Sequence, residues 1–400
     1  MRARLASLAG VGVLGLLSLT GCANKGAASR GQPRLADVPR PRPLWSVPVQ
    51  DRSVGIELPL SPDGTLFLLD PQRHAPFAVS AKTGARRWTA EVDPAFPFES
   101  SPYSARYFHL SLADDVLVIG TEGYLGAYRT EDGRRLWSRP EQDCHLDETR
   151  GAHLRLICPR NGRFTDRVVN AATGEEVAVV EPPPVDDRTA TPLSRLRAWR
   201  DVTLGDDVVL VAWDNDTKME GRSLRVGQPS WRVDLPPDPT VDERVAVPML
   251  FVDGVIVWFG GPIIALDEST GRRLWERPLP RGHQRTAAGS MLWLMEGAEL
   301  VALDPHSGVI RERYPVPSLP HRGAAYEILT AGDRVALVEA NTRTPVTKGE
   351  GYVFTWSKSS PTPAIFKRPA GTDVFALVGD VLLAAGMDEG PVVAGDLGGR

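Results

Sequence analysis

The chain has 400 residues and a nearly balanced charge, with 46 Lys and Arg against 50 Asp and Glu and a formal net charge of −4. No basic segment is dense enough to bind a polyanion, so the composition excludes nucleic acid as a partner. The 38 Gly and 35 Pro are spread along the chain, and no 3.6-residue apolar period is sustained. These features favour an all-β protein with many tight turns.

The N-terminal residues have the layout of an export signal. Arg2 and Arg4 precede a small and apolar run that ends at Leu19, and this run is too short to span a bilayer as a mature helix. Residues 19–22, LTGC, resemble the lipobox of bacterial lipoproteins. This resemblance implies that residues 1–21 are removed and that Cys22 carries a lipid. An ordinary export signal with a chance Cys is the alternative.

The same resemblance implies a lipid-anchored, extracytoplasmic location in the cell envelope. Ala23 stands where an Asp is associated with retention at the inner membrane. The expected location is therefore the periplasmic face of the outer membrane, or the outer face of the cytoplasmic membrane in a host without an outer membrane. Residues 22–43 are small, polar and Pro-rich, which predicts a flexible tether ahead of a folded region at residues 44–400.

The folded region repeats a strand, a Thr-Gly turn and a second strand with a Trp near its start. The pattern A-x-D-x-x-T-G-x-x-x-W is complete at residues 265–275, where it contains Gly271 and Trp275. The partial copies are Gly84 with Trp88, Gly133 with Trp137, Gly174 without a Trp, Gly227 with Trp231, and Gly308 with Glu312 at the Trp position. Copies of one pattern that recur along a chain indicate an array of similar structural units.

A second repeated element lies upstream of most of these turns. It is a short Asp- or Gly-containing turn that leads into a strongly apolar strand. Copies begin near residues 62, 113, 205, 252, 288, 331 and 378, and a weaker one begins at His153. Such dipeptides between apolar runs indicate β-hairpins because Asp and Gly accept positive φ.

Together the two elements predict four antiparallel strands per unit, which is the blade of a β-propeller. The last unit, ending at residue 400, lacks its fourth strand, whereas Trp45 lies in a strand that has no turn before it. We therefore expect these two ends to pair and to close a ring of eight blades, which would leave no open sheet edge between first and last blade. Seven blades is the alternative, because the third and seventh units are degenerate.

The repeat resembles that of the pyrroloquinoline-quinone (PQQ)-type propellers over residues 44–400. The resemblance implies that Trp45, Trp88, Trp137, Trp231 and Trp275 dock between blades and that Gly84, Gly133, Gly174, Gly271 and Gly308 shape the turns. A large, mostly apolar ring with one N–H donor suits such a seam. The quinoprotein enzymes of this fold have adjacent Cys residues and a calcium site, and this chain has no Cys-Cys pair.

Two Cys residues remain after Cys22. Cys144 and Cys158 are fourteen residues apart in an exported chain, and they suit a disulfide between two neighbouring strands. Two free, buried thiols are the alternative. Their spacing does not fit a metal site.

The closer resemblance is to the short BamB-type propeller lipoproteins, which lack the quinone site. It implies a non-catalytic scaffold that binds other exported or membrane proteins, without a cofactor or metal. Residues 91–107, 181–196, 236–247 and 340–351 interrupt the repeat and are the candidate binding insertions. The alternative function is a ligand-binding or quinoprotein-type enzymatic propeller, for which Asp214, Asn215, Asp216 and Glu220 are the one oxygen-rich cluster.

Overall fold

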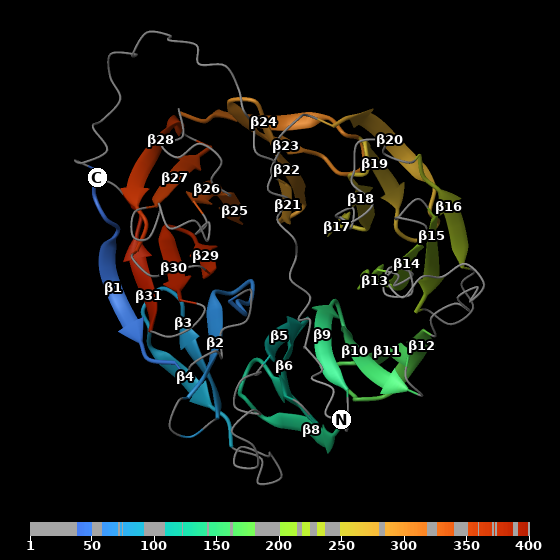
Figure 1. The fold of residues 1–400 in the computed structure, drawn as a ribbon. Helices are drawn as coiled ribbons and strands as arrows, with labels where there is room; N and C mark the ends of the chain where they lie inside the picture. Colours follow the sequence, from blue (N-terminus) through green and yellow to red (C-terminus); the bar gives the residue numbers. More distant parts are fainter. Residues whose placement is uncertain are drawn as a thin grey trace, which may run out of the picture.

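The chain folds into a closed ring of β-sheets (Figure 1). The computed structural model describes residues 38–49, 58–70, 73, 75–91, 109–121, 123–141, 144–160, 163–180, 201–213, 218–224, 230–236, 249–279, 285–317, 326–339, 351–358, 360–369, 372, 374–386 and 391–398. Secondary structure in these residues is strand, turn and bend, and none of them lies in a helix. No membrane-spanning helix is found among the residues described.

Eight sheets form the blades, which we number along the chain from blade 1. Blade 1 has β2 (Thr65–Leu69), β3 (Pro76–Ser80) and β4 (Arg86–Thr89). Blade 2 has β5 (His109–Ala113), β6 (Val116–Thr121), β7 (Tyr124–Arg129) and β8 (Arg135–Pro140). Blade 3 has β9 (His145–Arg150), β10 (His153–Arg160), β11 (Arg163–Asn170) and β12 (Glu176–Val180). Blade 4 has β13 (Asp201–Leu204), β14 (Val208–Trp213), β15 (Lys218–Ser223) and β16 (Trp231–Asp234).

The second half of the chain continues in the same way. Blade 5 has β17 (Met249–Val252), β18 (Val255–Trp258), β19 (Pro262–Asp267) and β20 (Arg273–Pro278). Blade 6 has β21 (Arg285–Ala288), β22 (Met291–Glu296), β23 (Glu299–Leu303) and β24 (Ile310–Pro315). Blade 7 has β25 (Tyr326–Ala331), β26 (Arg334–Glu339), β27 (Tyr352–Ser357) and β28 (Ser360–Lys367). Blade 8 has β29 (Val374–Val378), β30 (Val381–Ala385), β31 (Val392–Asp396) and β1 (Arg42–Val47).

Every blade is an antiparallel meander whose first strand lies toward the centre of the ring. In blade 1 the first position is held by residues 58–60, of which Leu60 forms a single bridge with Leu66. First strands of neighbouring blades contact one another, as β5 does with β9 and β21 with β25. Because the strands alternate in direction, the turns between strands 1 and 2 and between strands 3 and 4 share one face of the ring. We call this the turn face, and the opposite side the connection face.

The hydrophobic core is divided among the seams between blades. Alternate residues of a strand face opposite neighbours, so a strand such as β6 contributes Val118 to one cluster and Leu117 and Ile119 to another. The second strand is buried on both faces in blades such as 2, 5 and 8, which explains why their repeated apolar runs are continuous and do not alternate. In blade 3 the second strand, β10, does alternate, with Leu154, Leu156 and Cys158 buried and Arg155 and Ile157 partly exposed.

The ring closes where β1 pairs antiparallel with β31, with Trp45 opposite Ala394. The prediction of eight blades closed by the two chain ends is confirmed. The degenerate third and seventh units form complete four-stranded sheets, so the seven-blade alternative is wrong. The expected lipid anchor at Cys22 and residues 1–37 lie outside the described residues.

Contacts with the ring begin before the expected start at residue 44. Val38 is buried, with 6 % of its surface exposed, in the cluster that fills the seam of blades 6 and 7. The Lys367 amide donates a hydrogen bond to the Pro39 carbonyl at 2.7 Å. Residues 38–43 therefore lie on the propeller, although their Pro-rich composition is typical of a tether.

Candidate interaction surface

Five of the eight seams are joined by a Trp from the fourth strand of one blade. The ring N–H donates to a backbone carbonyl in the third turn of the next blade, three residues before the turn glycine. The bonds are Trp45 to Ala81 (3.1 Å), Trp88 to Thr130 (2.8 Å), Trp137 to Ala171 (2.7 Å), Trp231 to Glu268 (2.9 Å) and Trp275 to Pro305 (2.6 Å). We call these the Trp seams.

The turn glycine of the next blade lies directly under each indole. Gly84, Gly133, Gly174, Gly271 and Gly308 all have φ between +67° and +74°. A Cβ added at Gly271 would lie 2.3 Å from the Trp231 ring, and one at Gly308 would lie 2.8 Å from the Trp275 ring. The sequence motif therefore joins two blades: its Gly receives the Trp of the preceding blade, while its own Trp extends to the following one.

The Asp of the motif organises the turn. In blade 5, Asp267 Oδ1 accepts the Thr270 N–H at 2.9 Å and the Thr270 hydroxyl at 2.7 Å. Burial raises the pKa of Asp267, but the hydrogen bonds from Thr270 and Ser269 outweigh it, and the pKa lies below its ordinary value. A short carboxylate that accepts backbone N–H groups two and three residues ahead is a common way to fix such turns.

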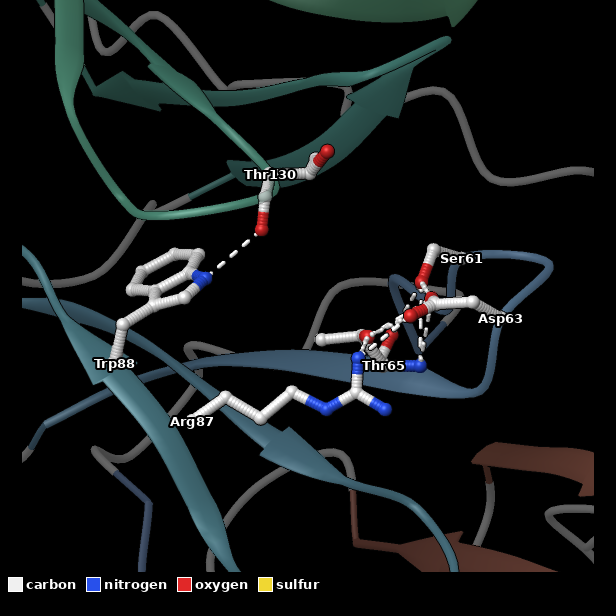
Figure 2. A network of polar contacts seen from close by, with 6 residues as sticks. All are labelled: Ser61, Asp63, Thr65, Arg87, Trp88 and Thr130. Carbon is white, nitrogen blue, oxygen red and sulfur yellow. Dashed lines mark hydrogen bonds and ion pairs between the residues drawn. The ribbon is translucent and has the colours of Figure 1, made fainter.

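In the turn between the first and second strand positions of blade 1, which we call its inner turn, an Asp also accepts hydrogen bonds from neighbouring residues (Figure 2). Asp63 accepts from the hydroxyls of Ser61 and Thr65, and the Arg87 guanidinium lies 2.5 Å from its carboxylate. These groups, the Ser61 hydroxyl first, hold the pKa of Asp63 well below its usual range. The same view shows the neighbouring Trp88, whose N–H is bonded to Thr130 of blade 2.

Three seams have a different residue at the Trp position, and each contains an ion pair between blades. Ala178, Glu312 and Ala364 occupy this position in blades 3, 6 and 7. The pairs are Arg150 with Asp206 at 2.9 Å between blades 3 and 4, Lys358 with Glu312 at 3.3 Å between blades 6 and 7, and Arg334 with Asp380 between blades 7 and 8. We call these the ion-paired seams. Sequence reasoning identified Glu312 as a replacement for Trp but missed all three pairs.

All of these seam contacts lie on the turn face, because they involve first and third turns. The four candidate insertions attach elsewhere. Three connect the fourth strand of one blade to the first strand of the next, and the fourth connects β26 to β27, so the strand ends that flank them lie on the connection face. Apart from Glu91, Pro236 and Gly351 at their ends, the insertions lie outside the described residues.

A disulfide joins Cys144 to Cys158 across the β9–β10 hairpin of blade 3. Next to it, Glu141 is buried and pairs with Arg139 at 2.6 Å and with Arg167 at 2.9 Å. The Arg167 guanidinium also lies 3.7 Å from the Cys144 sulfur. The ion pairs of Glu141 connect the end of blade 2 to blade 3, and the disulfide fixes the first hairpin of blade 3.

Replacing both Cys144 and Cys158 by Ala is expected to lower the free energy of unfolding. The disulfide closes a loop with a sequence separation of 14 residues. A loop of this length corresponds to about 3 kcal/mol of lost unfolded-state entropy. Urea unfolding with and without a reductant measures the effect. The double variant should be insensitive to the reductant, and a wild-type curve that the reductant leaves unchanged would contradict the prediction.

A second polar network surrounds Arg155 in blade 3. Its guanidinium contacts Asp147, lies 2.9 Å from Asp166 and is 3.5 Å from Glu148, which accepts the Leu204 N–H of blade 4 at 2.9 Å. Burial raises the pKa values of Glu148 and Asp166. The network thus joins three strands of blade 3 to the inner strand of blade 4.

Glu268 is a buried carboxyl in the seam of blades 4 and 5, and its burial predicts that the stability of the ring depends on pH. Its Oε1 accepts the Asp207 N–H at 3.3 Å, and the charges of Asp206 and Arg150 act on it in opposite senses. Burial raises its pKa above the ordinary Glu value. A group with a raised folded pKa contributes stability below its unfolded pKa, and this stability is lost as the pH rises through the folded pKa. Glu268→Gln is therefore expected to gain stability relative to wild type as the pH rises above the ordinary Glu pKa of 4.5, a change that is followed from pH 5 to pH 8.

Thermal unfolding of both proteins across this range measures the difference. Asp267→Asn is the matched control, because the pKa of Asp267 is lowered and its contribution is present above the unfolded value and lost only in acid. Its deficit relative to wild type should stay constant from pH 5 to pH 8. A constant difference between wild type and Glu268→Gln would contradict the prediction.

Of the oxygen-rich cluster considered from the sequence, the structure describes only Glu220. Glu220 is held between Arg222 at 2.7 Å and Arg232 at 2.9 Å, and Asp214, Asn215 and Asp216 lie outside the described residues. In the part of the chain that the structure describes, no group of three or more His, Cys, Asp and Glu side chains is arranged to hold a metal ion.

Comparison with solved structures supports the architecture. BamB from Moraxella catarrhalis superposes with a TM-score of 0.52 and 14 % identity, covering 89 % of this chain and 99 % of that one. The C-terminal WD40 domain of Sif2 gives a TM-score of 0.50 and 10 % identity, covering 90 % and 99 %. A quinohemoprotein alcohol dehydrogenase from Pseudomonas putida HK5 is similar at a TM-score of 0.47 and 13 % identity, covering 90 % of this chain and 76 % of that one. At these identities the likeness to the first two structures shows the fold alone.

Sequence comparison defines the family. No curated protein sequence matches the chain. The family described as outer membrane protein assembly factor BamB matches residues 31–181 and 194–293, which is more than half of the chain. The matched residues include the first five blades and the closing strand β1. They contain both partners of four Trp seams, those of Trp45, Trp88, Trp137 and Trp231. This chain is therefore a member of the BamB family of β-propellers.

Proposed function

We propose that the protein is a non-catalytic interaction scaffold that binds other exported or membrane proteins through its connection face. The observation that carries this proposal is that the contacts between blades and the insertions lie on opposite faces of the ring. Trp and ion-pair contacts join the blades on the turn face, whereas all four insertions attach to strand ends on the connection face. Long, variable segments on a rigid scaffold are a common arrangement for recognition.

The cellular setting of the proposal follows from the N-terminal sequence and from the family. The lipobox-like residues 19–22 support lipid attachment at Cys22, and the family description supports a role in outer-membrane protein assembly. The lipid holds the ring at the extracytoplasmic side of a membrane. The partners are then proteins of the same compartment.

Crosslinking and purification of the lipidated protein from its own membranes, followed by mass spectrometry, tests the proposal. We expect a reproducible protein partner, whose identity as a β-barrel assembly component would support the envelope role. Cys22→Ser should move the protein from the membrane to the soluble fraction. Recovery of no protein partner would overturn the scaffold function and favour a small ligand at the ring centre.

Variants of the two faces locate the binding surface. Deleting the four insertions together should abolish capture of the partner. The matched control replaces exposed residues of the turn face, Lys82, Glu131 and Arg272, by Ala and should leave capture unchanged. If the deletion leaves every partner bound, the connection face is not the docking surface.

A further inference from the structure

The eight seams divide the ring into two arcs and one separate blade. Trp seams join blades 8, 1, 2 and 3 into one arc and blades 4, 5 and 6 into another. Blade 7 belongs to neither arc, because ion-paired seams flank it on both sides. In the seam of blades 6 and 7, the side chains of Lys358 and Glu312 are 61 % and 25 % exposed. Such exposed pairs hold weakly and are screened by salt.

The N-terminal segment crosses the outside of blade 7. Val38 is buried in the cluster formed by blades 6 and 7, which includes Trp293 and Trp356. One residue later, the Pro39 carbonyl accepts the Lys367 N–H of β28, the outer strand of blade 7. From Arg42 onward the segment is β1, the outer strand of blade 8. Residues 38–47, which we call the strap, therefore extend from one seam of blade 7 across its edge to the next blade.

We propose that the strap replaces the missing Trp contacts of blade 7 and that its withdrawal releases this blade while the two arcs stay intact. Blade 7 packs on blade 6 through an apolar cluster in which the Tyr314 and Trp356 rings lie 6.0 Å apart. Where the Trp seams have an indole N–H bonded to a backbone carbonyl, however, the two seams of blade 7 have ion pairs. The strap adds a buried side chain at one seam and a backbone hydrogen bond at the outer edge. These contacts restrain the blade from outside the ring. The proposal concerns a conformational device and does not depend on lipid attachment or on a partner.

The geometry of the strap explains why a small change could release it. Only Val38 enters the seam of blades 6 and 7 from this segment, and only Pro39 bonds to β28 among the described residues. The pairing of β1 with β31 begins three residues after Pro39, so it holds blade 8 independently. Loss of the Val38 contact thus weakens blade 7 without opening the closure.

Hydrogen exchange measured by mass spectrometry on the full chain tests the proposal. Val38→Asp places a charge in an apolar seam, and we expect exchange in β25–β28 to be roughly tenfold faster, with blades 2 and 5 unchanged. Val38→Ala should give a smaller effect at the same strands, which covers the case in which the Asp variant does not fold. Arg42→Ala removes an exposed pair with Asp396 and is the matched control, expected to leave blade 7 unchanged.

A second measurement separates the ion-paired seams from the Trp seams. In 1 M sodium chloride the strap variants should show a further increase of exchange in blade 7, because salt screens the two remaining pairs. Unchanged protection of β25–β28 in both Val38 variants would overturn the proposal. An increase spread equally over blades 2, 5 and 7 would also overturn it, because that result indicates a general loss of stability.

Discussion

Gly271→Ala is expected to lower the free energy of unfolding by about 3–4 kcal/mol, through backbone strain at positive φ together with a steric clash. Gly271 has a φ of +67°, and an added Cβ would lie 2.3 Å from the Trp231 ring. Trp231 cannot retreat without losing its hydrogen bond to Glu268 at 2.9 Å. Urea unfolding of the purified protein measures the loss.

Gly254 provides the matched control for this variant. It has a φ of +71° in an inner turn of the same blade, and an added Cβ would meet nothing within 4 Å. Gly254→Ala therefore carries the backbone cost alone, about 1 kcal/mol. If Gly271→Ala and Gly254→Ala lower the free energy of unfolding equally, the close contact of the Trp231 ring does not contribute to the requirement for Gly271.

Trp45→Ala is expected to destabilise the closure of the ring. Truncation of a fully buried Trp to Ala costs about 3–5 kcal/mol, and the half-buried Trp45 should cost less than this. Trp45 packs with the cluster of blades 8 and 1 and bonds to the Ala81 carbonyl at 3.1 Å. Because Trp45 belongs to the closing strand, its loss should also speed hydrogen exchange in β1 and β31. Urea unfolding and hydrogen exchange measure the two effects.

Trp88→Ala removes the same kind of contact one seam further along, where the chain is continuous on both sides. We expect a similar loss of stability without faster exchange in β1. If Trp88→Ala speeds hydrogen exchange in β1 as much as Trp45→Ala does, the stability of the closing strand does not depend specifically on Trp45.

The fold could be predicted from the sequence because its unit is local. A turn glycine and a Trp four residues later describe a hairpin, and the apolar run upstream describes the buried second strand. The closure was also accessible, since the last unit lacked a strand and Trp45 lacked a turn. The degenerate blades 3 and 7 were harder, because Ala178 and Ala364 carry no sign of the position they occupy.

The seam chemistry could not be predicted in the same way. Whether Arg150 meets Asp206, or Lys358 meets Glu312, depends on the rotation of one blade against the next, which the spacing of the repeat does not specify. Val38 was assigned to a tether because its neighbours are Pro-rich and polar. Its burial is determined by a cluster from blades 6 and 7, about 250 to 320 positions away in the sequence.

Ring closure has a consequence for the order of folding. Arg42 and Asp396, which pair across the closing strands, are separated by 354 positions in the chain. A chain that is made or exported from its N-terminus contains β1 from the start, but β31 becomes available only at the end. Among the described strands, closure is therefore the last pairing that the growing chain can form, and it closes the longest loop between any two paired strands. Until β1 pairs with it, the edge of β31 can pair with other chains. Protection of this edge is therefore the step at which a chaperone would most reduce aggregation.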